Sequence, residues 1–119
     1  MTAATDGDAP EAVSVTISNF VVKTVRDYTG RGPTRARTYI HDDLVTIVLR
    51  DTLTKGERSL VADGYEDEVL RMRLAFQQTM RTALVAGVED ILGRKVEAFL
   101  SANHIDPDVA TETFVLAPQ

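Results

Sequence analysis

Residues 65–92, YEDEVLRMRLAFQQTMRTALVAGVEDIL, have the clearest periodicity in the chain and decide its fold. Their apolar side chains recur three or four positions apart, which is typical of one face of an α-helix. They are Val69, Met72, Phe76, Met80, Leu84, Val88 and Ile91. Acidic residues fill the first turn, where they favour a helix N-terminus, and Gly93 supplies a stop at the other end. We therefore predict one long helix whose apolar face packs against a sheet.

A second apolar flank lies beside this face, formed by Leu70, Leu74 and Val85. The opposite face carries Arg73, Gln77 and Arg81. The helix would be roughly 40 Å long, against a radius of gyration of about 13–14 Å for a compact domain of this size. One small sheet would leave part of its apolar surface uncovered. We therefore predict a homodimer, since pairing with a second copy is the commonest way to bury such a patch. The alternative cover is the N-terminal helix, whose own apolar stripe also needs a partner, either within one chain or across to the neighbouring one.

Composition bounds the class of protein. The chain has 119 residues, enough for one domain, which we expect to occupy residues 11–119 after a disordered tail at residues 1–10. It has no cysteine and a net charge of −5. That charge argues against nucleic-acid binding. The absence of cysteine fits a cytoplasmic chain. No apolar run reaches the ~20 residues of a membrane span, so we expect no direct membrane insertion.

The segment at residues 11–29 fits two patterns. Val13, Val15 and Ile17 alternate with polar residues, as in a strand, but Val21 and Val25 extend a helical stripe through Ile17. Nineteen residues without a breaker is long for a strand and normal for a helix. The flanking Pro10 and Gly30 also favour a helix.

The remaining elements follow from local signals. Two strands at residues 35–41 and 44–50 flank an Asp-Asp hairpin turn, and the second is apolar on both faces. Thr54 and Glu57 match a capping box that starts a short helix before Gly64. Two more strands are predicted at residues 95–102 and 110–116. The result is an α+β domain of order α-ββ-αα-ββ: a four-stranded, mainly antiparallel sheet of two hairpins packed against one long helix plus shorter helices.

Candidate binding residues gather around the glycine-rich turn. Gly30, Arg31 and Gly32 resemble part of a phosphate loop, but no Lys-Ser/Thr follows and the turn precedes a strand. Arg35 and Arg37 would project from the same face of that strand. Guanidinium groups suit bidentate capture of a carboxylate or phosphate, although they could equally pair with the protein's own acids.

A second group of candidates flanks the two later helices. Glu57, Arg58 and Arg73 could pair across the helix–helix contact or bind an anion or a partner. The two histidines, His41 and His104, sit at predicted turns without the spacing of a metal site. No nucleophile, base and orienting group are placed together, so we expect no catalytic residue, no metal, no cofactor and no enzyme activity.

Five segments from Tyr28 onward resemble, in one order, a small bacterial family known mainly as a domain of unknown function. They are residues 29–33, residues 53–60, Arg73 with residues 76–77, residues 93–96 and residues 114–116. Members are named after MpsC, a component of a proposed Na⁺-translocating membrane-potential-generating system. The resemblance implies a small soluble domain associated with a membrane system, and it implies no reaction, substrate or catalytic residue.

Two functions follow as expectations. The first is a non-enzymatic accessory or interaction domain, by resemblance linked to the Na⁺-translocating system, that docks on a membrane-associated protein from the periphery of the membrane. The alternative is a small-anion or metabolite-binding domain that uses the segment from Gly30 to Arg37.

Overall fold

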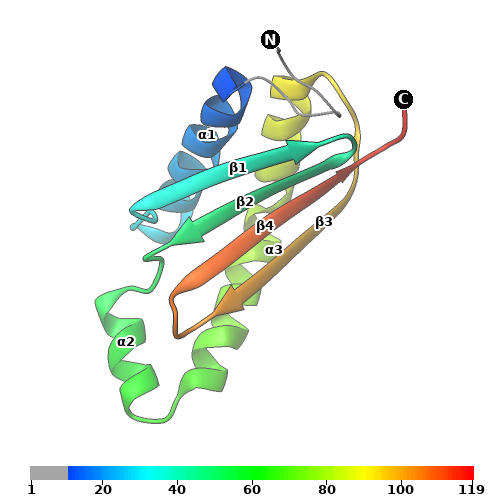
Figure 1. Cartoon of the computed structure of the whole chain (residues 1–119). Coiled ribbons are helices and arrows are strands. Elements are labelled where there is room, and N and C mark those ends of the chain that lie inside the picture. The colour runs from blue at the N-terminus through cyan, green and yellow to red at the C-terminus, as the bar shows by residue number, and fades with distance from the viewer. Residues whose placement is uncertain (1–10) are drawn as a thin grey trace.

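The computed structural model describes residues 11–119, which form three helices and four strands (Figure 1). In chain order these are α1 (Glu11–Thr29), β1 (Arg35–His41), β2 (Leu44–Arg50), α2 (Lys55–Ala62), α3 (Glu66–Leu92), β3 (Val96–His104) and β4 (Val109–Leu116). The predicted α+β class and element order are confirmed, and the first segment is a helix. The predicted tail at residues 1–10 lies outside the described residues.

The four strands form one antiparallel sheet in the order β1-β2-β4-β3. Each predicted hairpin is present, and the two are joined through β2 and β4. Asp42 has a φ of 52°, which the tight turn between β1 and β2 requires. β3 extends two residues further than predicted, to His104, because the hairpin turn is confined to residues 105–108.

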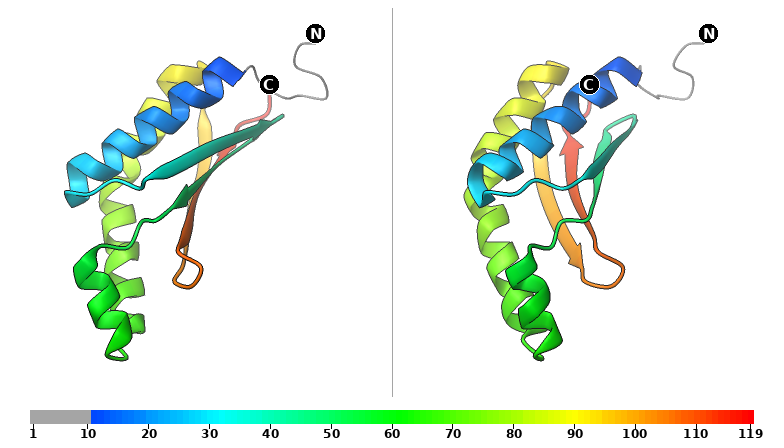
Figure 2. Two further views of the ribbon diagram at one scale, coloured as in Figure 1. Left: turned by 60° about the vertical axis from the view of Figure 1, so that its left-hand side comes forward. Right: turned by 90° about the vertical axis from the view of Figure 1, so that its left-hand side faces the viewer.

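Helices α1 and α3 cover one face of the sheet, and none of the helices in residues 11–119 covers the other (Figure 2). The core lies between these layers. Its largest fully buried apolar side chains are Phe114, Ile17, Ile47, Leu84 and Leu116. Alternation along β4 aims Phe114 and Leu116 at the helices, which is why the strand periodicity could be read from the sequence.

The two covering helices meet at Gly87. A Cβ at this position would sit 1.9 Å from Cζ of Phe20, so only glycine allows the ring of α1 to lie against the backbone of α3. The C-terminal half of α3 is thereby covered by α1. Its N-terminal half runs past the end of the sheet beside α2 (Figure 1).

The inner face of this N-terminal half differs from the prediction. Met72 and Phe76 are 42% and 37% exposed, whereas Gln77 is only 5% exposed. Arg73 and Gln77, which we predicted on the outer face, point inward because polar side chains from α2, β3 and β4 receive them. The apolar spacing therefore identified Val69, Met80, Leu84 and Val88 as core residues correctly. It was wrong for Met72 and Phe76, which lie between Val69 and Met80 in sequence.

Local capping signals are confirmed at both helix junctions. The Thr54 hydroxyl accepts a hydrogen bond from the Glu57 N–H at 3.1 Å, and the Glu57 carboxylate accepts one from the Thr54 N–H at 2.8 Å. Gly93 ends α3 in the left-handed conformation with φ of 65°. These short-range bonds explain why the helix boundaries were predictable.

Replacing Phe114 and Phe76 by alanine should distinguish a core residue from a partly exposed one. Phe114→Ala removes a fully buried ring whose centroid lies 5.0 Å from that of Phe99, and should cost about 3–5 kcal/mol of unfolding free energy. Phe76→Ala should cost less than half as much, because its ring is partly exposed. Denaturant unfolding of both variants provides the measurement. Equal costs would contradict this account of the core.

Candidate functional site

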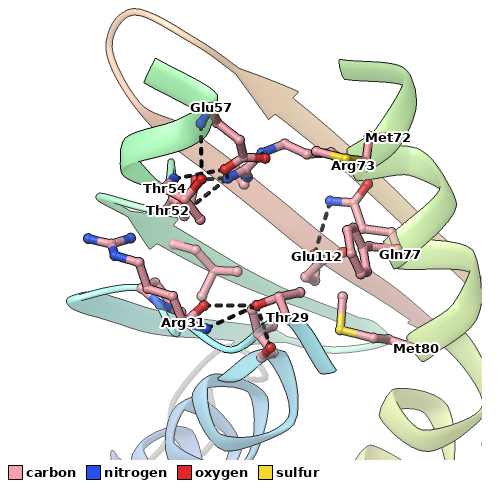
Figure 3. Close-up of a pocket in the computed structure, with 15 residues that line it drawn as sticks. Thr29, Arg31, Thr52, Thr54, Glu57, Met72, Arg73, Gln77, Met80 and Glu112 are labelled. Carbon is pink, nitrogen blue, oxygen red and sulfur yellow. Dashed lines mark hydrogen bonds and ion pairs between the residues drawn. The ribbon is translucent and has the colours of Figure 1, made fainter. Parts of the chain in front are cut away.

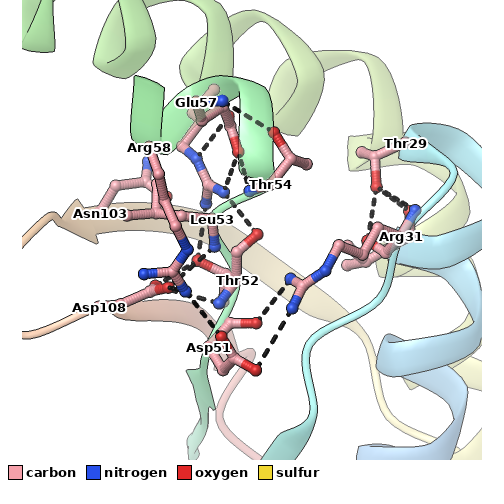
Figure 4. A network of polar contacts seen from close by, with 12 residues as sticks. Thr29, Arg31, Asp51, Thr52, Leu53, Thr54, Glu57, Arg58, Asn103 and Asp108 are labelled. Carbon is pink, nitrogen blue, oxygen red and sulfur yellow. Dashed lines mark hydrogen bonds and ion pairs between the residues drawn. The ribbon is translucent and has the colours of Figure 1, made fainter. Parts of the chain in front are cut away.

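A polar cluster joins four separate segments at the end of the sheet where β2 leaves it (Figure 4). Asp108, from the turn between β3 and β4, accepts hydrogen bonds from the N–H groups of Thr52 and Leu53 at 3.0 and 2.9 Å. Its carboxylate also accepts from the Thr52 hydroxyl at 2.8 Å. Burial alone would raise the pKa of Asp108, but these hydrogen bonds outweigh it and lower the pKa below its ordinary value.

Arg73 and Glu57 form the most buried ion pair of this cluster. Arg73 Nε and Nη2 donate to the two oxygens of Glu57 at 3.0 and 2.8 Å, in a bidentate arrangement. The remaining guanidinium nitrogen, Nη1, reaches the Thr52 hydroxyl at 2.9 Å, and Nη2 also reaches the Thr52 carbonyl at 2.7 Å. Burial works to raise the pKa of Glu57, but the bonds from Arg73 and Thr54 lower it, so the carboxylate stays ionised.

Asp51 is the third acid of the cluster. Its carboxylate accepts from Arg31 at 3.3 Å and from Arg58 at 2.8 Å, and its carbonyl accepts from Arg31 at 2.8 Å. Four of the predicted site residues, Arg31, Glu57, Arg58 and Arg73, are thus brought together. The three arginines form ion pairs with the protein's own acids, Asp51, Asp108 and Glu57. This is the pairing that we gave as the alternative to ligand binding.

The other four predicted site residues lie apart from this cluster. Gly30 has a φ of 84° and ends α1, and a Cβ on Gly32 would meet the Val22 carbonyl at 3.3 Å, so these glycines shape the turn. Arg35 and Arg37 project from the uncovered face of the sheet. The segment from Gly30 to Arg37 is therefore divided between two surfaces.

A cavity of about 280 Å³ opens beside the cluster, between α1, α3 and the inner face of the sheet (Figure 3). Its apolar lining comes from Val25, Pro33, Leu49, Met72, Phe76, Met80 and Ala110. Its polar lining includes Arg31, Glu57, Arg73, Gln77 and Glu112. Met72 and Phe76 are partly exposed because they lie where α1 no longer covers α3.

Glu112 is the buried acid of this cavity, with only 2% of its surface exposed. It accepts hydrogen bonds from the Ser101 hydroxyl and from Gln77 Nε2, the latter at 3.3 Å. Gln77 is oriented by a reciprocal pair with Asn103, at 3.1 and 3.0 Å. Burial raises the pKa of Glu112 to about 7, although the bonds from Ser101 and Gln77 act to lower it.

Our sequence interpretation missed Glu112 and Gln77. One signal pointed to Glu112: it shares its strand face with Phe114 and Leu116, so the alternation of β4 already implied a buried acid. Gln77 had no such signal, because it shares its side of the helix with Arg73 and Arg81, four residues to either side.

The uncovered face of the sheet carries arginines and apolar side chains. Arg35 lies directly opposite Arg50 in the β1–β2 register, and Arg37 follows two residues along β1. Arg37 stacks over the ring of Tyr39, with its Cζ 5.4 Å from the ring centroid. Tyr39, Leu44 and Leu100 are 53%, 47% and 55% exposed on this face.

Comparison with known families agrees with the resemblance noted in the sequence. The sequence model described as "Na+-translocating membrane potential-generating system (MpsC)" matches residues 10–118. The chain belongs to the MpsC family. The match includes α1, which lay outside the motifs that we recognised. No curated protein and no solved structure matches the chain.

Two further observations concern membrane-spanning helices and metal-binding groups. None of the helices in residues 11–119 is both long enough and apolar enough to cross a membrane. Within the same residues, no group of three or more histidine, aspartate or glutamate side chains is placed to hold a metal ion. The features that remain as candidate sites are the cavity and the uncovered sheet face.

Replacing Glu112 by glutamine should change the pH dependence of stability. The pKa of Glu112 is about 7 in the folded protein against an ordinary 4.5. The protonated side chain therefore contributes to the unfolding free energy in full below pH 4.5, and this contribution is lost as pH rises through 7. The difference in unfolding free energy between wild type and Glu112→Gln should therefore shift by about 3 kcal/mol in favour of the variant between pH 4 and pH 8.

Denaturant unfolding at several pH values measures this shift. The lowered pKa values of Asp108 and Glu57 make stability rise with pH, the opposite trend. Both residues are present in wild type and variant, so their effects cancel in the difference. Glu97→Gln, at an exposed position on β3, is the matched control and should follow wild type. A difference that is independent of pH would contradict the assignment.

Proposed function

We propose that this chain is a non-enzymatic accessory domain of a Na⁺-translocating membrane-potential-generating system, and that it docks on an acidic surface of another protein component. The observation that carries the proposal is the placement of Arg35, Arg37 and Arg50, which we call the arginine face. Arg35 and Arg50 are cross-strand partners, and like charges in that position destabilise a sheet.

The arginine face differs from the arginines of the polar cluster. Arg31, Arg58 and Arg73 each form an ion pair with a carboxylate. No carboxylate within residues 11–119 forms an ion pair with the arginine face, although the chain is acidic overall. An acidic partner would supply the missing counter-charge and relieve the repulsion between Arg35 and Arg50.

The surroundings of the arginine face favour a protein as that partner. Tyr39, which stacks with Arg37, adds an exposed ring, and tyrosine with arginine is a composition typical of protein interfaces. Leu44 and Leu100 add exposed apolar surface farther along the same face of the sheet. Nucleic acid or an anionic membrane would present an extended negative surface to a chain of net charge −5 and would repel the rest of it. An acidic protein segment need contact the arginine face alone.

The geometry gives less support to capture of a small anion by the segment from Gly30 to Arg37. Arg31 already donates to Asp51, and Arg35 and Arg37 project from a different surface. An anion would therefore have to displace Asp51 from Arg31. Docking through the arginine face requires no such exchange.

Removing the three charges tests the docking proposal. Arg35→Gln/Arg37→Gln/Arg50→Gln should weaken binding to the system's detergent-solubilised membrane components at least tenfold, and wild-type affinity should fall steeply with added salt, since the attraction is electrostatic. Biolayer interferometry on the immobilised components provides the measurement.

The matched control removes three other exposed charges, in Lys55→Gln/Arg71→Gln/Lys95→Gln, and should bind as wild type. Equal binding by both triple variants would overturn the proposal. Binding of wild type to protein-free anionic vesicles with the same affinity would assign the arginine face to lipid instead.

We also propose that the chain forms a homodimer through the N-terminal half of α3. Leu74 is 49% exposed there, and Asp67 and Arg81 lie seven residues to either side, on the same side of the helix. The guanidinium of Arg81 also stacks over the ring of Phe99, with its Cζ 5.8 Å from the ring centroid, and would keep that contact or exchange it for Asp67 of the second copy. An antiparallel pairing about a two-fold axis near Leu74 would set Asp67 of each protomer opposite Arg81 of the other and bury both leucines.

Light scattering at micromolar concentration tests this pairing. Wild type should have the mass of two chains, and Leu74→Arg should have the mass of one, because two arginines would meet on the axis. Leu100→Arg changes an equally exposed leucine on the uncovered sheet face and should stay dimeric. A wild-type mass of one chain would exclude the dimer.

A further inference from the structure

The cavity between α1, α3 and the sheet has the dimensions of a small-molecule site. Its volume of about 280 Å³ compares with roughly 30 Å³ for a water molecule in the liquid and is just below the usual range for ligand pockets. Apolar side chains from four elements form most of its wall. The exposed edges of Met72 and Phe76 mark its opening, and the unbranched Met72 can move aside for an entering molecule.

The charges in the wall leave one group without a counter-ion. Arg73 is bound to Glu57 and Thr52, and Arg31 is bound to Asp51 (Figures 3 and 4). Glu112 receives hydrogen bonds only from the neutral side chains of Ser101 and Gln77. A carboxylate buried without a cation is costly unless it is protonated or a cation is supplied.

We propose that this cavity binds a small organic cation, an ammonium group on an apolar body, with the ammonium against the Glu112 carboxylate and the apolar body against Met80, Leu49 and Val25. Such a ligand supplies a counter-ion for the Glu112 carboxylate, and its apolar body fills the apolar part of the cavity. An anion would face Glu112 beside arginines that are already neutralised. A neutral apolar molecule would leave the carboxylate uncompensated.

The protonation of Glu112 gives this site a characteristic pH dependence. Its pKa of about 7 in the empty cavity means that a proton and the ammonium group compete for the same carboxylate near neutral pH. Because the ammonium binds the ionised form, affinity should level off as the pH approaches 8, where the carboxylate is ionised and the ammonium is still protonated. It should fall about tenfold for each pH unit well below 7, where a proton must first be displaced.

Three probes of one shape separate the ligand classes: 2-phenylethylamine, 2-phenylethanol and 3-phenylpropanoate. Isothermal titration of the full chain at pH 8 should give at least tenfold tighter binding for the amine than for the alcohol or the acid. The amine remains protonated from pH 5 to 8, so any loss of affinity on acidification reports the protein. Glu112→Gln should weaken amine binding at least tenfold and remove its pH dependence.

Two further variants keep the result interpretable. Glu97→Gln makes the same chemical change at an exposed position outside the cavity and should bind the amine as wild type. Ala110→Leu should block all three probes, because Ala110 lines the cavity and is 3% exposed. The proposal is overturned if wild type binds no probe, if it prefers the alcohol or the acid, or if amine binding is independent of pH. These wild-type results decide the matter even if Glu112→Gln fails to fold.

Discussion

The bidentate contact between Arg73 and Glu57 is the interaction on which the rest of this structure depends. The first turns of α3 and all of α2 lie beyond the end of the sheet, where few apolar side chains can hold them (Figure 1). Arg73 reaches from α3 to the carboxylate of α2 and to the Thr52 carbonyl of the preceding linker. Glu57 meanwhile closes the capping box that starts α2. Removing either partner would leave a charge largely buried and uncompensated, a strongly destabilising change.

The same contact explains why a cavity exists beside the core. It holds α2 and the N-terminal half of α3 in place without filling the space that α1 leaves uncovered. Gln77 and Glu112 then replace apolar packing with hydrogen bonds on the floor of that space. A fully hydrogen-bonded polar layer gives a unique arrangement at the cost of some stability, which fits a binding cavity better than a packed core.

The cavity and the arginine face lie on opposite sides of one sheet. Leu49 lines the cavity, and Arg50, the next residue of β2, belongs to the arginine face because successive strand residues point to opposite faces. The proposed ligand site and the proposed docking surface therefore share β2. Neither uses the exposed leucine of α3 that would form the dimer contact, so the three sites can be occupied independently.

The sequence by itself determined the identity and order of the helices and strands. Those elements depend on short-range features: period-two and period-3.6 hydrophobicity, the Thr54 capping box and the left-handed stop at Gly93. It also left open that Arg31, Arg58 and Arg73 pair within the protein rather than bind a ligand or partner. Two of the acids that pair with them, Asp51 and Asp108, were not predicted. Asp108 in particular lies fifty or more residues away in sequence from its hydrogen-bond donors.

Only the tertiary structure decided which side of α3 faces inward along its N-terminal half. Spacing alone favoured Met72 and Phe76, which line the cavity but stay partly exposed. Arg73 and Gln77 are the more buried pair because partners 16 to 35 residues distant in sequence satisfy their polar groups. The opposition of Arg35 and Arg50 likewise arises from strand register, which depends on the turn between β1 and β2 and on the burial of one sheet face. Periodicity reports which residues could be buried, whereas long-range hydrogen bonding determines which polar residues actually are.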